Sequence, residues 1–190
     1  MIITIAGRAG SGKSTIAQKL SKKLGWRYYD IGAIRRYKAK SLNMSLAEYN
    51  KFGENNPQTD FELDLYQKKL GETSDNFVIS GRTSWHFIPC SIKIYLDVKE
   101  NIGAKRIWNR LKRKNNQNED KNLKTIKNVF ASQAQRMASD IKRYKKYYKI
   151  NVYDYKNFDY VLDTTALTKK QVLDQVCGYI KKNCQKIDKK

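Results

Sequence analysis

The segment from Gly7 to Ser14 carries residues whose types and spacing could do chemistry. Its sequence, GRAGSGKS, fits the pattern G-x-x-x-x-G-K-[ST] of a phosphate-binding loop, or P-loop. Glycines let the backbone turn its N–H groups toward an anion, Lys13 adds a compact positive charge, and the Ser14 hydroxyl can reach a magnesium ion beside a nucleoside triphosphate. The predicted ATP-binding residues are Gly7, Arg8, Ala9, Gly10, Ser11, Gly12, Lys13, Ser14 and Thr15.

The residues on either side of this loop favour a strand before it and a helix after it. Residues 1–6 are apolar and mostly β-branched, as expected of a buried strand. After the loop, Ile16, Leu20 and Leu24 recur every four residues, and Gly25 suits a helix C-terminus. The alternative is a glycine-rich turn without a ligand, which this strand, loop and helix context disfavours.

Length and composition favour a single α/β domain of 190 residues. The apolar run at the N-terminus is too short for a signal peptide, and no stretch approaches the length of a membrane span, so we expect a cytoplasmic protein. The cysteines Cys90, Cys177 and Cys184 lack metal-ligand spacing, which indicates reduced thiols. His86 is the only histidine in the sequence, which argues against histidine-based catalysis or a zinc site.

The formal net charge of +21 suits polyanionic partners, either nucleotides or nucleic acid. A general enrichment in lysine along the chain explains most of this charge. Residues 100–149 nevertheless hold fifteen Lys or Arg against four Asp or Glu, an excess of eleven positive charges. We expect this region to bind phosphate groups, and a nucleotide is favoured over a nucleic acid as the molecule that carries them.

Residues 30–36, with the sequence DIGAIRR, follow a short aromatic strand predicted over 26–29. They resemble the cytidylate kinases, P-loop nucleoside monophosphate kinases whose second strand ends in D-[ST]-G-A-[IM]-[YF]-R; Ile31 and Arg35 depart from this pattern. The resemblance implies that Arg36 holds the phosphate of the monophosphate acceptor and that Asp30 lies near magnesium. Without the P-loop, a helix start with a solvated arginine would be the preferred interpretation.

Two helices are predicted in the next segment. Ser45 and Glu48 form a capping-box pattern for a helix running toward Gly53, and a second helix is expected from Asp60 to Leu70, ended by Gly71. The short, archaeal-type cytidylate kinases are similar here, with a D-x-E-[LI]-D segment. Asp60 and Asp64 could therefore read the acceptor base, or they could be helix N-terminal charges favoured by the dipole.

A buried strand is predicted over 77–80, followed by Gly81 and Arg82. In the family this strand carries an acidic residue and then Gly-Arg, which implies that Arg82 contacts the acceptor phosphate. Ser80 stands where the family has Asp or Glu. The chain therefore lacks, at this position, the carboxylate that the resemblance implies would support the bound magnesium.

Another strand is predicted over 91–97, where apolar residues alternate, and a helix follows. On this helix Arg106 and Arg110 are four residues apart, so we expect both guanidinium groups to converge on one anion. Residues 112–121 contain no apolar side chain and are predicted to form a flexible, solvated loop.

The longest periodic segment predicts one amphipathic helix ending near Tyr148. The family carries R-x-x-S-[DE]-x-x-R-[YF] here, which implies that Arg136 and Arg143 belong to a lid over the transferring phosphoryl group; Asp140 matches the acidic position. The expected apolar stripe consists of Leu123, Ile126, Phe130, Ala134, Met137, Ile141, Tyr144 and Tyr148.

A last strand over 158–163, a capping box formed by Thr168 and Gln171, and a final helix complete the chain, with residues 181–190 expected to fray. Alternating strands and helices predict a doubly wound parallel sheet with the P-loop NTPase and nucleoside monophosphate kinase architecture. One domain spans residues 1–190, with a core (1–31, 77–102 and 149–190), an acceptor-binding flap (32–76) and a lid (103–148).

These features predict magnesium- and ATP-dependent phosphoryl transfer to a nucleoside monophosphate, CMP or dCMP, by a monomer without membrane contact. The alternatives are an adenylate or other small-molecule kinase, and a nucleic-acid-associated ATPase or binding module. The predicted catalytic residues are Lys13, Arg106, Arg110, Arg136 and Arg143. The predicted acceptor-binding residues are Arg36, Asp60, Asp64, Gly81 and Arg82, and the predicted metal-binding residues are Ser14 and Asp30.

Overall fold

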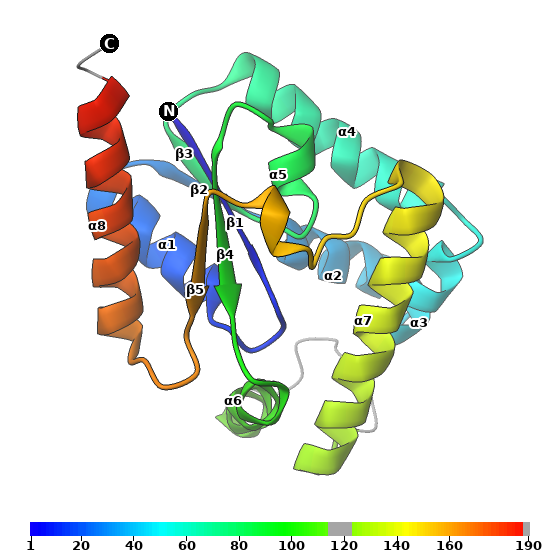
Figure 1. Cartoon of the computed structure of the whole chain (residues 1–190). Helices are drawn as coiled ribbons and strands as arrows, with labels where there is room; N and C mark the ends of the chain where they lie inside the picture. The colour runs from blue at the N-terminus through cyan, green and yellow to red at the C-terminus, as the bar shows by residue number, and fades with distance from the viewer. Residues whose placement is uncertain (114–122, 188–190) are drawn as a thin grey trace.

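In the computed structural model, which describes residues 1–113 and 123–187, five parallel strands form a sheet with helices on both faces (Figure 1). The strand order is β2-β3-β1-β4-β5, and every pairing is parallel. This arrangement confirms the predicted doubly wound fold. The elements are β1 (Ile2–Gly7), α1 (Lys13–Leu24), β2 (Arg27–Asp30), α2 (Ile31–Ser41), α3 (Leu46–Gly53), α4 (Gln58–Thr73), β3 (Phe77–Ser80), α5 (Ser84–Phe87), β4 (Ile92–Asp97), α6 (Glu100–Arg113), α7 (Ile126–Tyr148), a 3-10 turn (Tyr155–Asn157), β5 (Tyr160–Asp163) and α8 (Lys169–Ile187).

The sheet is the centre of the core, with α1 and α8 on one face and the α2–α5 segment on the other (Figure 1). On the first face, Ile3 and Ile5 pack with Leu20 of α1 and Val176 of α8. On the other face, Phe77 is among the residues that pack with the start of α2. Because β1 and β3 are buried on both faces, their sequences are almost continuously apolar.

The P-loop follows β1, the strand at which the strand order of the sheet reverses. β1 lies between β3 and β4, so the connections on its two sides leave from opposite directions and open a crevice at the carboxyl ends of the strands. The segment predicted as a flap forms α2, α3 and α4, and the segment predicted as a lid contains α6 and α7. Helix α3 contacts α7, so the two segments meet beyond the crevice. Their movement stays a prediction.

Both predicted capping boxes are present. The Ser45 side chain accepts a hydrogen bond from the Glu48 amide at the start of α3, and Thr168 and Gln171 pair in the same way before α8. The predicted end of α4 is wrong, because the helix continues through Gly71 to Thr73. A Cβ at Gly71 would lie 2.9 Å from Cγ2 of Ile88, so this glycine allows close packing and does not cap the helix.

The apolar stripe predicted along α7 is buried only in part: Tyr144 is buried, whereas the other stripe residues are half-buried or exposed. Phe130 and Ile141 are 41% and 37% exposed, and Ile126 is exposed as well. Besides Tyr144, the helix buries Val129 and the charged side chain of Arg143, which lie outside the predicted stripe. The physical reason is that α7 contacts α3 and α6 over short stretches, and its inward charges meet opposite charges in the interior.

The predictions for the two polar segments are tested only in part. The loop expected over 112–121 begins within α6, and the rest of it lies outside the described residues. The tail expected to fray from residue 181 is helical through Ile187, while 188–190 lie outside the described residues. None of the described helices combines the length and hydropathy that a bilayer crossing requires. Cys90 and Cys177 are free thiols.

Candidate active site

The P-loop joins β1 to α1, and two of its glycines are required by close backbone contacts. Gly7 has a φ of 144°, and a Cβ there would lie 2.1 Å from the carbonyl oxygen of Leu96. Gly10 has a φ of 81°, and its Cβ would lie 2.4 Å from the carbonyl oxygen of Gly103. Because any side chain would push β4 or α6 away, these positions explain the sequence pattern. The loop backbone therefore packs directly against β4 and α6. Its backbone amides can turn toward a bound phosphate.

Lys13 begins α1 and faces a cavity beside the loop. Its ammonium group donates a hydrogen bond to the backbone oxygen of Arg8 at 3.3 Å. Burial lowers the pKa of Lys13 to about 7, and the positive charges of Arg82 and Arg136 add to this effect. A phosphate bound here would replace lost hydration and supply the opposite charge, so the site favours anions.

A cavity of about 390 Å³ extends from the P-loop to the flap helices. Its lining brings together residues that the sequence places in the ATP-binding, acceptor-binding, metal-binding and catalytic groups. This grouping is the main geometric feature of the site, because the residues predicted to bind the donor and the acceptor line one cavity. The predicted residues that line it are Ala9, Gly10, Lys13, Ser14, Thr15, Asp30, Arg36, Asp60, Asp64, Gly81, Arg82, Arg110 and Arg136.

Four of the predicted ATP-binding residues are not among those that line this cavity: Gly7, Arg8, Ser11 and Gly12. Arg8 forms ion pairs with Asp97 at 3.1 Å and with Glu100 at 2.7 Å, so its side chain joins the loop to β4 and α6. Ser11 is buried, with 3% of its surface exposed. Arg8 and Ser11 can therefore serve the site through their backbone amides and not through their side chains.

The predicted metal-binding residues lie in a cluster of oxygen atoms at the carboxyl ends of β2 and β3. Ser14 Oγ is 3.4 Å from Ser80 Oγ, and the Tyr28 hydroxyl is 3.2 Å from Ser80 Oγ and 3.1 Å from Asp30 Oδ2. The second carboxylate oxygen of Asp30 accepts a hydrogen bond from the Ala33 amide and caps α2. Hydroxyl and carboxylate oxygens are hard ligands of the kind that magnesium prefers.

A chain of buried ion pairs forms the wall of the cavity. Asp60 binds Arg35 at 2.7 Å and Arg143 at 2.5 Å, Arg143 binds Asp140 at 2.6 Å, and Asp140 binds Arg82 at 2.8 Å. Each carboxylate therefore faces two guanidinium groups, which compensates the cost of burying its charge. Although burial opposes ionisation, Arg82 and Arg143 hold the pKa of Asp140 below its usual value.

Arg143 occupies a different position from the other predicted catalytic arginines. Its side chain is 0% exposed, is absent from the cavity lining, and is taken up by Asp60 and Asp140. Arg136, two turns earlier on α7, lines the cavity. The structure thus brings Arg136 to the cavity lining but buries Arg143 within the ion-pair chain of the wall.

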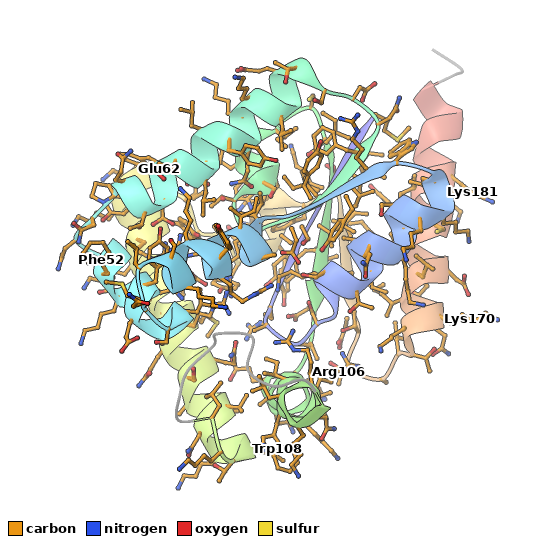
Figure 2. The ribbon with its side chains drawn as sticks, turned by 180° about the vertical axis from the view of Figure 1, so that it is seen from behind. Phe52, Glu62, Arg106, Trp108, Lys170 and Lys181 are labelled. Atoms are coloured by element: carbon orange, nitrogen blue, oxygen red, sulfur yellow. The ribbon has the colours of Figure 1, made fainter. Side chains whose placement is uncertain are left out.

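Arg106 and Arg110 do not converge as predicted. Arg110 lines the cavity. Arg106, labelled on α6 in Figure 2, instead donates from its guanidinium to the backbone oxygens of Thr164 at 2.7 Å and Thr165 at 3.2 Å. It also contacts the backbone oxygen of Gly10 at 3.5 Å. Arg106 therefore ties the P-loop to the segment after β5, because carbonyl oxygens occupy its donors.

Asp64 lies at the inner end of the cavity and is 4% exposed. It accepts hydrogen bonds from the Tyr148 hydroxyl at 2.7 Å, and from Thr83 Oγ1 and Gln67 Nε2 at 2.8 Å each. Burial raises the pKa of Asp64 to about 6 despite the bonds from Tyr148 and Thr83. Three hydrogen bonds thus hold its carboxyl group in place, and its pKa lies closer to neutral pH than that of an ordinary aspartate.

Sequence reasoning missed the positions of Arg35, Tyr28 and Tyr148. Arg35 had been noted only as a departure from a motif, yet it is 6% exposed and donates to Asp60 and to Asn50 Oδ1. Tyr28 was assigned only to a strand. The partners of Arg35 and Tyr148 belong to other elements, so no sequence signal connects them. Tyr28 and Asp30 are two residues apart on one strand, and this spacing is a local signal that could have paired them.

Comparisons with known proteins place this geometry in a family. A model described as the cytidylate kinase-like family matches residues 2–166. The chain belongs to this family. A cytidylate kinase of Methanosphaera stadtmanae is 35% identical over 164 residues, which cover 86% of this chain and 88% of that protein. A cytidylate kinase of Methanocorpusculum labreanum is 32% identical over 173 residues, covering 90% and 92%.

A solved structure agrees on the fold. Shikimate kinase from Acinetobacter baumannii superposes with a TM-score of 0.60 at 14% identity, covering 96% of this chain and 93% of that one. The predicted family, fold and phosphotransferase class are therefore confirmed for this cytidylate kinase-like chain, and ATP use follows from the kinase family. Nothing in these comparisons favours the alternative of a nucleic-acid-associated ATPase.

Proposed function

We propose that this chain transfers the terminal phosphoryl group of ATP to CMP or dCMP, forming CDP or dCDP and ADP. One observation carries the proposal: a single cavity of about 390 Å³ is lined both by the P-loop and by the flap residues that match the family's acceptor motifs. The curated relatives described above are named cytidylate kinases, which supports cytidylate as the acceptor. We also propose that the protein is cytoplasmic and acts as a monomer.

On the donor side, the P-loop amides and Lys13 hold the terminal phosphates of ATP. Ser14 and Asp30 are the residues that would hold magnesium, because a hydroxyl and a carboxylate together with substrate phosphates are a sufficient ligand set for this ion. When bound, the ion neutralises charge that develops on the phosphate oxygens. Arg106 keeps the P-loop in register with the segment after β5, where the donor adenine would lie.

On the acceptor side, Arg36 and Arg82 hold the acceptor phosphate, and Gly81 lets the backbone approach it. Asp60 and Asp64 line the part of the cavity that would receive the base. The side chain of Asp64 has fixed partners, so it can select hydrogen-bonding groups on a base edge. Arg143 contributes indirectly, by holding Asp60 and Asp140 in position.

In the reaction, an acceptor phosphate oxygen attacks the γ-phosphorus of ATP in line with the bond to the bridging oxygen. That bond breaks, and its electron pair leaves with ADP. Arg110 and Arg136 compensate the negative charge that spreads over the transferring group. Closure of α6 and α7 would exclude water, which otherwise competes as the acceptor.

The test is ATP consumption measured with magnesium and with CMP, dCMP, UMP, AMP, GMP or dTMP, beside a control without acceptor. We expect turnover with CMP or dCMP and little without an acceptor. ATP hydrolysis at one rate whatever the monophosphate would overturn the proposal and would make stimulation by RNA the next measurement. Preferred turnover with AMP would instead identify the adenylate alternative.

A further inference from the structure

We propose that Tyr28 is a positioning residue that links Asp30 to the predicted magnesium ligand Ser14 through a directed relay of hydroxyl groups. The relay runs Ser14, Ser80, Tyr28, Asp30 and joins the P-loop helix to β3 and β2. It rests on the proposed use of a magnesium–nucleotide complex. Its consequence is that a carboxylate on β2 tunes a hydroxyl on α1 through the intervening hydroxyl groups of Tyr28 and Ser80.

The relay follows from the register of the sheet. Asp30 and Ser80 are Cα partners in the parallel pairing of β2 with β3, both at the carboxyl ends of their strands. Tyr28 lies two residues before Asp30, so both side chains point to the same face of β2. Its hydroxyl reaches Asp30 Oδ2 at 3.1 Å and Ser80 Oγ at 3.2 Å, and Ser80 Oγ reaches Ser14 Oγ at 3.4 Å.

The direction of the hydrogen bonds follows from the chemistry of the groups. An ionised carboxylate only accepts hydrogen bonds, so Tyr28 uses its single proton toward Asp30. Tyr28 must then accept from Ser80, and Ser80, with its own proton used, must accept from Ser14. Every hydroxyl proton points toward Asp30. The lone pairs of Ser14 Oγ are thereby left for a cation, and the negative charge of Asp30 polarises the whole chain.

The other carboxylates around the cavity are engaged elsewhere. Among the described residues that line it, the acidic side chains are Asp30, Asp60 and Asp64. Asp60 is held by Arg35 and Arg143, and Asp64 accepts three hydrogen bonds from neighbouring side chains. Of these three carboxylates, Asp30 is the one connected to the Ser14 hydroxyl through hydrogen bonds, and the connection runs through Tyr28 and Ser80.

The test measures ADP binding with and without magnesium, and the binding of Mn²⁺ in the presence of ADP by electron paramagnetic resonance. The Tyr28→Phe variant keeps the ring and removes the relay hydroxyl. We expect its Mn²⁺ affinity in the ADP complex to fall about fivefold, the value of one hydrogen bond, with metal-free ADP affinity unchanged. Tyr29→Phe is the matched control, because Tyr29 packs against Tyr66 and Phe77 outside the cavity.

Two further variants make the test independent of Tyr28. Ser80→Ala breaks the relay at its next member and should weaken Mn²⁺ binding to a similar extent. Asp30→Ser removes the carboxylate but keeps a residue able to cap α2, and adding Ser80→Asp returns a carboxylate beside Ser14. We expect the double variant to recover metal affinity that Asp30→Ser alone has lost.

The outcomes separate this proposal from the proposed function. Unchanged Mn²⁺ affinity in folded Tyr28→Phe, or in Ser80→Ala if the first variant does not fold, overturns the relay and leaves the kinase assignment intact. The expected metal effects in an enzyme that does not phosphorylate CMP or dCMP would support the relay and refute the acceptor. Wild-type protein that binds ADP equally well with and without metal overturns both the relay and the proposed use of magnesium.

Discussion

Asp60 of α4 and Arg143 of α7 lie 2.5 Å apart, with 2% and 0% of their side chains exposed. They come from the segments predicted as flap and lid and are separated by 83 residues. Arg143 also binds Asp140, and Asp140 binds Arg82 at the end of β3. The pair therefore joins flap and lid through buried charges, and Asp140 extends this connection to Arg82 of the core, whose side chain is 13% exposed.

Replacing Arg143 with alanine should destabilise the fold. It would leave Asp60 and Asp140 each with one of their two cationic partners, and breaking a buried ion pair by removing one partner costs about 3–5 kcal/mol. Urea unfolding followed by circular dichroism measures this loss. Lys142→Ala is the control, because its exposed pair with Glu54 should contribute less than about 1 kcal/mol. Equal stability of the two variants would contradict the structural role of Arg143.

Replacing Arg136 with alanine should lower kcat and leave the fold intact. Arg136 lines the cavity, as Arg110 does, and there it would compensate charge on the transferring phosphoryl group. Arginines in this role contribute factors of about 10³ to 10⁵ in turnover. Steady-state kinetics with CMP measure the change, and the unfolding midpoint serves as a control. Near-normal turnover would remove Arg136 from the site.

Replacing Arg36 with alanine should mainly raise the KM for the acceptor. Arg36 lines the flap side of the cavity and lies 4.0 Å from Asp30. Losing one charged hydrogen bond to a phosphate costs about 1.5–3 kcal/mol, which corresponds to a roughly 10- to 150-fold weaker interaction. The KM for CMP and the KM for ATP should be measured together, with Lys40→Ala on the same helix as the control. An unchanged acceptor KM would contradict this role.

Nucleotide binding should take up a proton through Lys13. Its pKa is about 7 in the nucleotide-free protein, and neighbouring phosphates would raise it in the complex. Above pH 7 the free protein has lost a proton that binding must restore, so affinity should fall as pH rises. Calorimetry of ADP binding in two buffers with different ionisation enthalpies measures this uptake. Lys13→Met should bind more weakly and lose the lysine's share of the uptake, and identical uptake in both proteins would assign the proton elsewhere.

The P-loop and its flanking elements were predictable because their signals are local. The spacing of Gly7, Gly12 and Lys13, the apolar strand before them and the helix after them depend on neighbouring residues only. Arg36 and Arg82, which the resemblance singled out, both line the cavity, and each belongs to a recognisable motif that begins at the end of a strand. The end of α4 was mispredicted because Gly71 serves a contact with Ile88, which is distant in sequence.

Arg136 and Arg143 mark the boundary of what a sequence pattern can determine. They are seven residues apart on one helix, about two turns, so periodicity places both on the same face. One lines the cavity and the other is buried, because only Arg143 lies opposite Asp60 of α4. That difference depends on how α7 crosses the flap helices.

The sequence by itself determined the family, the parallel α/β fold and the phosphate-binding loop, because each rests on contiguous residues or on short-range periodicity. Only the tertiary structure decided which charged side chains face the cavity and which hold its wall. Arg35 with Asp60, Asp60 with Arg143, and Tyr28 with Ser80 are pairs drawn from different elements. Their proximity depends on strand register and helix packing, which no local pattern encodes.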